Sequence, residues 1–417
     1  MTGIGTNWAG NYSYKARRLH EPESIDELRR IVAGAERVHA LGTRHSFTDV
    51  ADSTDLVSLA KLPEGIELDT DLRTVTVNAG MPYGVLARKL EDAGFALHNM
   101  ASLPHISVGG AIATATHGSG VTSGNLATAV VGLELVTSDG ELLTVGRSDP
   151  EFPGMVVNLG ALGVVTRVTL AMEPSYRMRQ QVFERLDWDV ALDRFDEIMA
   201  SATSVSYFTD YGETVNQVWT KQRVDDDTPP APDSLHGARV ATEQRHPIEH
   251  LSGEPCTEQL GTVGPWLSRL THFRMEFTPS AGEEIQSEYL LPRTHAAEAL
   301  RAVRNLADRI RPHLLISEIR TVAADDLWLS YAYGTDCVGI HFTWRRDQDG
   351  VNSVLPDIEA ALAPFEPRPH WGKLFLMPAS VVAPRFERLP DFRRLAEQLD
   401  PRHAFRNGFL ERHVLGA

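Results

Sequence analysis

The segment NMASLPHISVGGAIATATHGSG, residues 99–120, is the most informative part of this 417-residue chain. It contains four glycines and a proline among small or hydroxyl side chains. Glycine permits a close approach of the backbone, so the N–H groups of such a segment can bind an anionic ligand. A flexible glycine loop is the alternative, but Ile106, Val108 and Ile112 would gain nothing in a solvated linker. We therefore predict a buried cradle for a phosphate group and a ring.

The charge pattern indicates how this ligand is bound. From Ala93 to Gly140 the only Asp, Glu, Lys or Arg residues are Glu134 and Asp139. Main-chain dipoles, and not lysine or arginine, would therefore hold the anion. The whole chain carries a formal charge of −16, which argues against nucleic acid or an anionic membrane as a partner, because both attract basic proteins.

Composition bounds the class of protein. A hydrophobic content of 42% is enough for two cores of ordinary domain size. Cys256 and Cys337 are too few for a disulfide framework and lack metal-ligand spacing, so we expect no metal site. The first residues show no charged leader before an apolar stretch, and no window approaches ~18 consecutive apolar residues. We expect a soluble cytoplasmic protein.

Residues 38–172 have the pattern of one α+β domain. Ser24 and Glu27 form a capping box before a helix that ends near residues 34–37. Further predicted elements are strands in VHALG, at 56–59, at 74–78 and at 163–172, a helix near 84–92, and a hairpin around Ser138-Asp139-Gly140. No G-x-G-x-x-G turn opens a helix, which argues against a nicotinamide-binding Rossmann fold.

A second domain is predicted after Glu173-Pro174. It begins with a helix near 188–200 and strands near 204–209 and 215–221, followed at 224–253 by a long surface excursion without periodicity. The pattern then gives strand 285–291, helix 295–310, strands 314–322 and 338–344, helix 356–363 and strand 372–377. This β-α-β-β-α-β order predicts a ferredoxin-like antiparallel sheet.

Strand alternation places polar side chains on one face of this second sheet. The interpretation as an ordinary solvated face is open, because many antiparallel sheets have one. The mixture of donors and acceptors is also typical of a site for a polyhydroxylated ligand, whose hydroxyl groups need both. The residues concerned are Gln286, Glu288, Glu318, Arg320, His341 and Thr343, with Lys373 just after Trp371-Gly372.

Two motifs together resemble a known family. The loop GTRHS (42–46) and the segment SLPHISVGGAIATATHGSG (102–120) are similar to the FAD domain of vanillyl-alcohol-oxidase-type flavoproteins, which include sugar and aldonolactone oxidases. Within this family the chain resembles the alditol oxidases, through NWAGN (7–11), SEIRTVAAD (317–325), HFTW (341–344) and RPHWGK (368–373).

The resemblance implies an α+β, two-domain fold. A PCMH-type FAD-binding domain would span residues 1–173, and a ferredoxin-like substrate or cap domain would span 174–379. A C-terminal segment, 380–417, would return to the FAD domain.

The resemblance also implies FAD as the cofactor. His45 matches the histidine that is linked to the flavin 8α-methyl group, although a plain loop histidine is the alternative. The backbone of Val164 would contact the adenine side of FAD. His370 would approach the flavin from the second domain. Arg44 departs from the family, which often has a small residue there; its charge could neutralise the phosphates or alter the loop. The implied cofactor-binding residues are Leu41, Gly42, Thr43, Arg44, His45, Ser46, Ser102, Ser107, Gly110, Thr114, Thr116, His117, Val164 and His370.

The implied reaction oxidises the primary C1 hydroxyl of alditols such as xylitol and sorbitol to the aldose. Hydride would pass to flavin N5, and O2 would be reduced to hydrogen peroxide. Lys373 and Arg320 would stabilise the developing alkoxide, and His341 could take part in proton removal. Glu318 would accept hydrogen bonds from substrate hydroxyls and hold Arg320. The implied substrate-binding residues are Ser102, Gln286, Glu318, Arg320, Thr343 and Lys373, with His341 beside them.

Two alternatives stay open at this point. One is an aldonolactone or sugar dehydrogenase of the same fold that passes electrons to an acceptor other than oxygen. The other is a non-catalytic flavin- or carbohydrate-binding protein, which would need no cation such as Lys373. We expect a monomer whose partners are a small polyol and O2.

Overall fold

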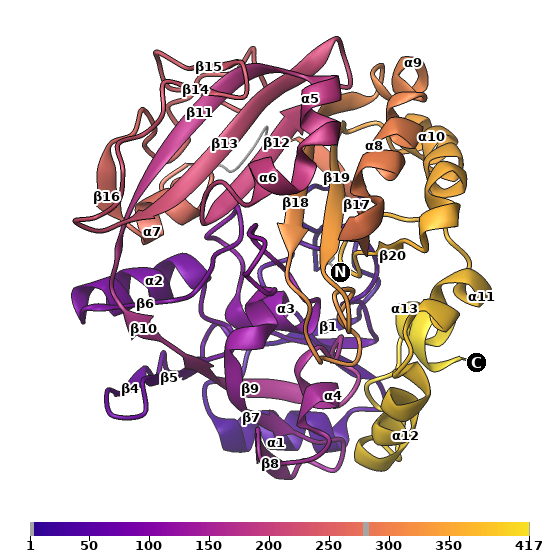
Figure 1. Ribbon diagram of the computed structural model, residues 1–417. Coiled ribbons are helices and arrows are strands. Elements are labelled where there is room, and N and C mark those ends of the chain that lie inside the picture. The colour runs from indigo at the N-terminus through magenta and orange to yellow at the C-terminus, as the bar shows by residue number, and fades with distance from the viewer. Residues whose placement is uncertain (1–3, 278–282, 417) are drawn as a thin grey trace.

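The computed structural model describes residues 4–277 and 283–416. Figure 1 shows the N-terminal part of the chain below a large sheet, with the C-terminal helices along one side. The predicted outer domain limits at residues 1 and 417 lie outside the described ranges. Within those ranges, no helix combines the length and apolar composition that crossing a membrane requires.

The N-terminal part contains two main sheets. A three-stranded parallel sheet has the order β1-β3-β2, and a five-stranded antiparallel sheet has the order β4-β5-β9-β7-β8. The strands are β1 (Arg18–His20), β2 (Val38–Ala40), β3 (Asp55–Val57), β4 (Glu67–Asp69), β5 (Thr74–Asn78), β7 (Val130–Val136), β8 (Leu142–Gly146) and β9 (Val164–Ala171). Helix α1 (Ile25–Gly34) begins as predicted, because the Ser24 hydroxyl accepts a hydrogen bond from the Glu27 N–H.

The 99–120 segment is more regular than its sequence suggests. It follows α2 (Tyr83–Asp92) and β6 (Phe95–Ala96), and contains the buried helix α3 (Val108–Ala113), which we did not predict. Gly109 lies in this helix against Ala79, and a Cβ atom there would lie 2.9 Å from the Ala79 Cβ. Packing therefore requires glycine at a position that looked like a loop. The turn η1 (Leu126–Ala129) and helix α4 (Phe152–Val156) complete this part.

The large sheet runs in the order β14-β15-β11-β13-β12-β18-β19-β17-β20, and β16 also pairs with β11. All its strand pairs are antiparallel. The strands are β11 (Arg177–Asp187), β12 (Ser204–Thr209), β13 (Thr214–Val224), β14 (Ser234–Leu235), β15 (Ala238–Val240), β16 (Val263–Pro265), β17 (Glu284–Pro292), β18 (Leu314–Val322), β19 (Cys337–Arg345) and β20 (Arg368–Pro369). The predicted ferredoxin-like strands are thus one end of a wider sheet, and β11 was missed.

The middle strands of this sheet are buried on both faces. Nearly every residue of β17, β18 and β19 is buried. Helices pack on the apolar face, and the polar face turns toward the N-terminal part (Figure 1). The interpretation as a solvated face is therefore wrong. The helices of this half are α5 (Trp188–Asp193), α6 (Phe195–Met199), α7 (Leu267–Leu270), α8 (Ala296–Arg304), α9 (Ala307–Ile310) and α10 (Gln348–Leu362), with turns η2 (Arg293–His295) and η3 (Ala363–Phe365).

Several predicted boundaries are wrong. The predicted helices near 188–200 and 295–310 are each two helices. Helix α10 begins eight residues before the predicted position, because the Asp347 carboxylate caps it by accepting the Gly350 N–H at 3.0 Å. The predicted strand 372–377 is a loop, since the Lys373 N–H turns back to the His370 carbonyl at 3.0 Å.

The 224–253 segment is only partly a surface excursion. It supplies β14 and β15, and its Ile248 side chain is buried beneath the sheet. The Gln217 side chain holds this part by donating a hydrogen bond to the His246 carbonyl at 2.9 Å. Contacts with the neighbouring strands β11 and β13, and not a local periodicity, therefore determine its place.

The C-terminal segment contains α11 (Ala379–Val382), η4 (Ala383–Arg385), α12 (Leu389–Leu399), α13 (Gly408–Leu410) and η5 (Glu411–Leu415). Its backbone contacts the N-terminal part, since the Val38 N–H donates to the Ala404 carbonyl at 2.8 Å. The short strand β10 (Glu173–Pro174) still pairs with β6 before the chain enters the large sheet. The domain limits at 173 and 379 stay a prediction that these contacts support.

Candidate active site

One cavity is lined both by the glycine-rich part of the first half and by the polar face of the large sheet. Every predicted site residue except Val164 lines it. Val164 is fully buried in β9, and its neighbours Gly163 and Val165 line the cavity instead. The predicted backbone contact at Val164 therefore stays a prediction.

The loop 41–46 forms the wall nearest α3. A Cβ atom on Gly42 would lie 2.6 Å from the Ser107 hydroxyl oxygen, so this close approach requires glycine. The Thr43 hydroxyl accepts the Ser107 N–H at 3.2 Å, which joins the loop to the start of α3. Arg44 has a left-handed φ of 64° and donates to the Ile4 carbonyl at 2.8 Å. Its guanidinium is thus bound by the N-terminal segment.

His45 lies in this wall with its ring stacked on Trp8, the centroids 5.6 Å apart. Its Nδ1 atom is 3.1 Å from the Thr43 hydroxyl. Burial, helped by the nearby His105, lowers the pKa of His45 to about 4, so the imidazole is neutral at ordinary pH. The adjacent Phe47 N–H donates to the Gly372 carbonyl at 2.8 Å, which ties this loop to the loop that carries His370 and Lys373.

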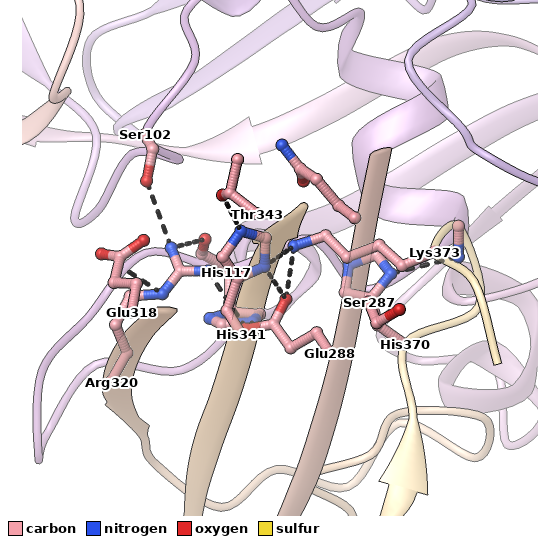
Figure 2. A network of polar contacts seen from close by, with 12 residues as sticks. Ser102, His117, Ser287, Glu288, Glu318, Arg320, His341, Thr343, His370 and Lys373 are labelled. Atoms are coloured by element: carbon pink, nitrogen blue, oxygen red, sulfur yellow. Dashed lines mark hydrogen bonds and ion pairs between the residues drawn. The ribbon is translucent and has the colours of Figure 1, made fainter. Parts of the chain in front are cut away.

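Glu288 is the centre of the opposite wall. Its side chain has no exposed surface, and one oxygen lies 2.5 Å from Lys373 Nζ. The other oxygen lies 3.1 Å from an Arg320 nitrogen and 3.0 Å from His117 Nε2, as Figure 2 shows. Burial alone would raise the pKa of Glu288, but its contacts with Lys373, His117 and Arg320 hold it well below the usual value.

His341 is held through both of its ring nitrogens. Nδ1 is 2.8 Å from Lys373 Nζ, and Nε2 is 3.0 Å from the Thr343 hydroxyl (Figure 2). Burial and the Lys373 charge lower the pKa of His341 to about 4, so the ring is neutral. Nδ1 then accepts from the lysine and Nε2–H donates to Thr343, an arrangement that suits orientation better than proton removal.

Arg320 connects this cluster to Ser102 and Glu318. It lies 3.3 Å from the Ser102 hydroxyl and 3.6 Å from a Glu318 oxygen. The same Glu318 oxygen lies 2.7 Å from His272 Nε2. Burial would raise the pKa of Glu318, but Arg320 and His272 lower it, so the carboxylate stays charged.

Two residues of this network were missed as site residues. The alternation of side chains along the strand predicted that Glu288 lies on the polar face. This alternation does not show which residues on that face bind one another. His272 lies in the 254–284 stretch, for which no pattern was found, and it meets Glu318 across 46 positions. Apolar side chains also line this cavity, among them Leu103, Phe208, Ile248, Phe273 and Ile316.

The first wall fits a dinucleotide cofactor with a ring system. Besides Arg44, it presents small residues, glycine backbone, apolar side chains such as Trp8, and the neutral His45. Helix α3 and the loop 41–46 approach each other too closely at Gly42 for a larger residue. Such a surface can accept a flat ring and a pyrophosphate through backbone groups.

Comparisons with known proteins agree with this geometry. Residues 16–146 match the family described as FAD binding domain, and residues 168–413 match the family described as D-arabinono-1,4-lactone oxidase. An alditol oxidase of Streptomyces sp. (strain IKD472 / FERM P-14339) is 47% identical over 415 residues, covering 98% of this chain and 99% of that protein. An L-gulono-1,4-lactone dehydrogenase of Mycobacterium tuberculosis is 30% identical over 436 residues, covering the full length of both proteins.

Solved structures carry the same fold. A crystal structure of cholesterol oxidase from B. sterolicum superposes with a TM-score of 0.79 at 16% identity, covering 98% of this chain and 96% of that one. The predicted α+β fold, with an FAD-binding domain and a large antiparallel sheet, is thus confirmed. The chain therefore belongs to the D-arabinono-1,4-lactone oxidase family of FAD-dependent oxidoreductases, in which an alditol oxidase is among its relatives.

Proposed function

We propose that this protein is an FAD-dependent alditol oxidase that converts the C1 hydroxyl of polyols such as xylitol and sorbitol to the aldose and reduces O2 to hydrogen peroxide. The observation that carries the proposal is the pair of cations, Lys373 and Arg320, held by the buried Glu288 on a wall of the cavity that the FAD-binding domain also lines. The 47% identity with an alditol oxidase over nearly the whole chain supports the choice of substrate class.

Bound FAD supplies the hydride acceptor and the site of oxygen reduction. The protein's part is to bind and orient the alcohol and to stabilise the negative charge that develops on its oxygen. Preorganised cations in a water-poor site are suited to this task, because they need no reorganisation during the reaction. Lys373 and Arg320 are such cations, since their common partner Glu288 fixes both.

The remaining polar groups suit the other hydroxyls of a polyol. Ser102 and Thr343 offer hydroxyl groups, and Glu318 offers a charged acceptor on the cavity surface. Gln286 is oriented by a hydrogen bond from its amide to Glu284, at 2.7 Å. Donors and acceptors on one wall match a chain of hydroxyl groups, and His341, which also lines the cavity, keeps Lys373 and Thr343 in place.

On the cofactor side we propose that the loop 41–46, Ser107, Gly110, Thr114, Thr116, His117 and His370 bind FAD, with a backbone contact at Val164. We also propose that His45 is linked covalently to the flavin. A neutral imidazole nitrogen is the form that can act as a nucleophile, and burial keeps His45 in that form.

Peroxide production across a panel of polyols and aldonolactones, measured beside oxygen consumption, tests the proposal. We expect stoichiometric peroxide with xylitol or sorbitol. The 30% identical lactone dehydrogenase makes an aldonolactone dehydrogenase the second candidate. That candidate predicts bleaching of the flavin by a lactone, with a dye and not oxygen as the effective acceptor. A flavin that no polyol or lactone bleaches anaerobically would contradict both. The cytoplasmic location and the monomeric state stay predictions.

A further inference from the structure

A buried lysine lies behind the cavity wall that carries Glu318, Arg320 and Lys373, which we call the substrate wall. Lys221, on β13, is 1% exposed and does not line the cavity. Its Nζ atom lies 2.6 Å from the Leu270 carbonyl, 3.0 Å from the Thr271 carbonyl and 2.8 Å from His272 Nδ1. These three acceptors match the three N–H bonds of an ammonium group.

His272 connects this lysine to the substrate wall. Its ring packs against Phe208 and Trp219, with centroids 5.5 and 5.3 Å away, and its Nε2 lies 2.7 Å from Glu318 Oε1. Because Nδ1 accepts from the lysine, Nε2 carries the hydrogen and donates it to the carboxylate. Lys221, His272 and Glu318 therefore form a chain of two hydrogen bonds that ends at one oxygen of the Glu318 carboxylate.

Packing alone gives no reason for a lysine at this position. The surrounding cluster is apolar and includes Phe208, Trp219 and Phe273. An aliphatic side chain would avoid the cost of burying a charge, but it would remove the donor to the Leu270 and Thr271 carbonyls and to His272. Of the three groups that the ammonium contacts, the His272 imidazole is the one that reaches the cavity, because it holds Glu318.

We propose that Lys221 and His272 are positioning residues for polyol binding: the Lys221 ammonium keeps His272 a neutral Nε2–H donor, so that Glu318 stays an oriented, fully charged carboxylate. This inference rests on the proposed function, because Glu318 is assigned there to the substrate hydroxyls. The charged groups that face His272 are Lys221, Glu318 and Arg320, and the Cys256 thiol also faces Lys221.

The titration directions agree with this role. Burial and the Lys221 charge lower the pKa of His272 to about 4. Burial lowers the pKa of Lys221 to about 7, against the opposing effect of Glu318. The lysine is thus charged in the acidic range, where an ordinary imidazole would take up a proton. An imidazolium would neutralise Glu318 and weaken it as an acceptor for hydroxyl groups.

The first test compares wild type with Lys221→Met over pH 5.5–7.5. In Lys221→Met we expect KM for xylitol to rise about tenfold toward the acidic end, because His272 becomes protonated there, with kcat changed by less than about twofold. Thr257→Val is the matched control, since the Thr257 hydroxyl donates to the same Thr271 carbonyl at 2.6 Å but carries no charge. A wild-type KM profile in Lys221→Met, or the same change in Thr257→Val, would overturn the proposal.

A double-mutant cycle tests the route through His272. A glutamine at position 272 can donate to Glu318 but cannot become a cation. In the His272→Gln background, Lys221→Met should therefore leave the pH dependence of KM unchanged. Additive effects of the two substitutions would show that Lys221 acts by another route.

A third readout needs no substrate. In protein labelled with 15N-histidine, we expect the His272 resonances, assigned by their loss in His272→Gln, to show one Nε2–H tautomer that does not titrate between pH 8 and 5. Titration with an ordinary pKa would overturn the proposal. If no polyol is oxidised, the proposed function fails, and this measurement still shows whether His272 is the neutral Nε2–H donor that the inference requires.

Discussion

Lys373 Nζ lies 2.5 Å from Oε2 of Glu288, and the Glu288 side chain has no exposed surface. The second carboxylate oxygen binds Arg320 at 3.1 Å, so one buried anion holds both cations of this cavity wall. Burying these charges is unfavourable unless they are paired, and the pairing fixes their geometry. Glu288 thus acts through Lys373 and Arg320 without lining the cavity.

Replacing Glu288 should lower both the free energy of unfolding and the rate of the reaction. In Glu288→Gln the shape is kept, but Lys373 and Arg320 lose their charged partner, and we expect a loss of about 3 kcal/mol in the free energy of unfolding. Denaturant unfolding measures this loss. Glu276→Gln is the control, because the Arg88–Glu276 pair is 62% exposed on both sides and should contribute less than about 1 kcal/mol. Equal losses in the two variants would contradict the role of Glu288.

Lys373→Met tests the cation nearest Glu288 directly. We expect flavin reduction by xylitol to slow by about 100-fold or more, as when one preorganised donor to a developing oxyanion is removed. FAD should stay bound, because Lys373 lies on the large-sheet side of the cavity. Anaerobic stopped-flow spectroscopy measures the reduction rate, and the absorbance of the purified protein reports the FAD. A wild-type reduction rate would exclude Lys373 from the chemistry.

The covalent link through His45 can be tested without substrate. We expect acid-precipitated protein to stay yellow, and His45→Ala to release its flavin into the supernatant. Arg44→Gly should keep the link, because the Arg44 guanidinium is bound to the Ile4 carbonyl at 2.8 Å. Release of all flavin from the wild-type protein would refute the attachment.

The polar face was predictable because successive side chains of a strand point to opposite faces of the sheet. This rule holds along the whole of β17, β18 and β19. The same rule does not say what covers the face, so a solvated surface stayed open until the N-terminal part was seen against it. Lys221 and His272 were beyond prediction for a different reason. Their contacts with each other and with Glu318 join segments 46 to 51 positions apart, and no local pattern encodes such pairs.

The predicted strand at 372–377 was wrong for a reason that also bears on the site. The run GKLFLM is apolar enough for a strand, but the Lys373 N–H is bound to the His370 carbonyl, and the Leu374 N–H is bound to the Gln286 carbonyl. These two contacts bend the chain into a turn. The turn places Lys373 Nζ beside Glu288. A continued strand at 372–377 would not by itself bring these two groups together.

Asp325 gives the chain a pH-dependent stability. It lies in the loop that carries Tyr331, whose hydroxyl donates to the Ala115 carbonyl of the 99–120 segment. One Asp325 oxygen accepts from Asn125 at 2.7 Å and from Ser330 at 2.6 Å. Burial nevertheless raises the pKa of this carboxyl from 3.8 to about 6.

Because the folded-state pKa of Asp325 is the higher one, the stabilisation that it gives is fully present below pH 3.8 and is lost as the pH rises through about 6. Relative to Asp325→Asn, which cannot ionise, the wild-type protein should lose about 2 kcal/mol in the free energy of unfolding between pH 4 and pH 7. The difference between the two proteins isolates this carboxyl from the other titrating groups, and denaturant unfolding at both pH values measures it. A difference that does not change with pH, or that changes in the opposite direction, would show that Asp325 ionises in the folded protein as easily as in the unfolded chain.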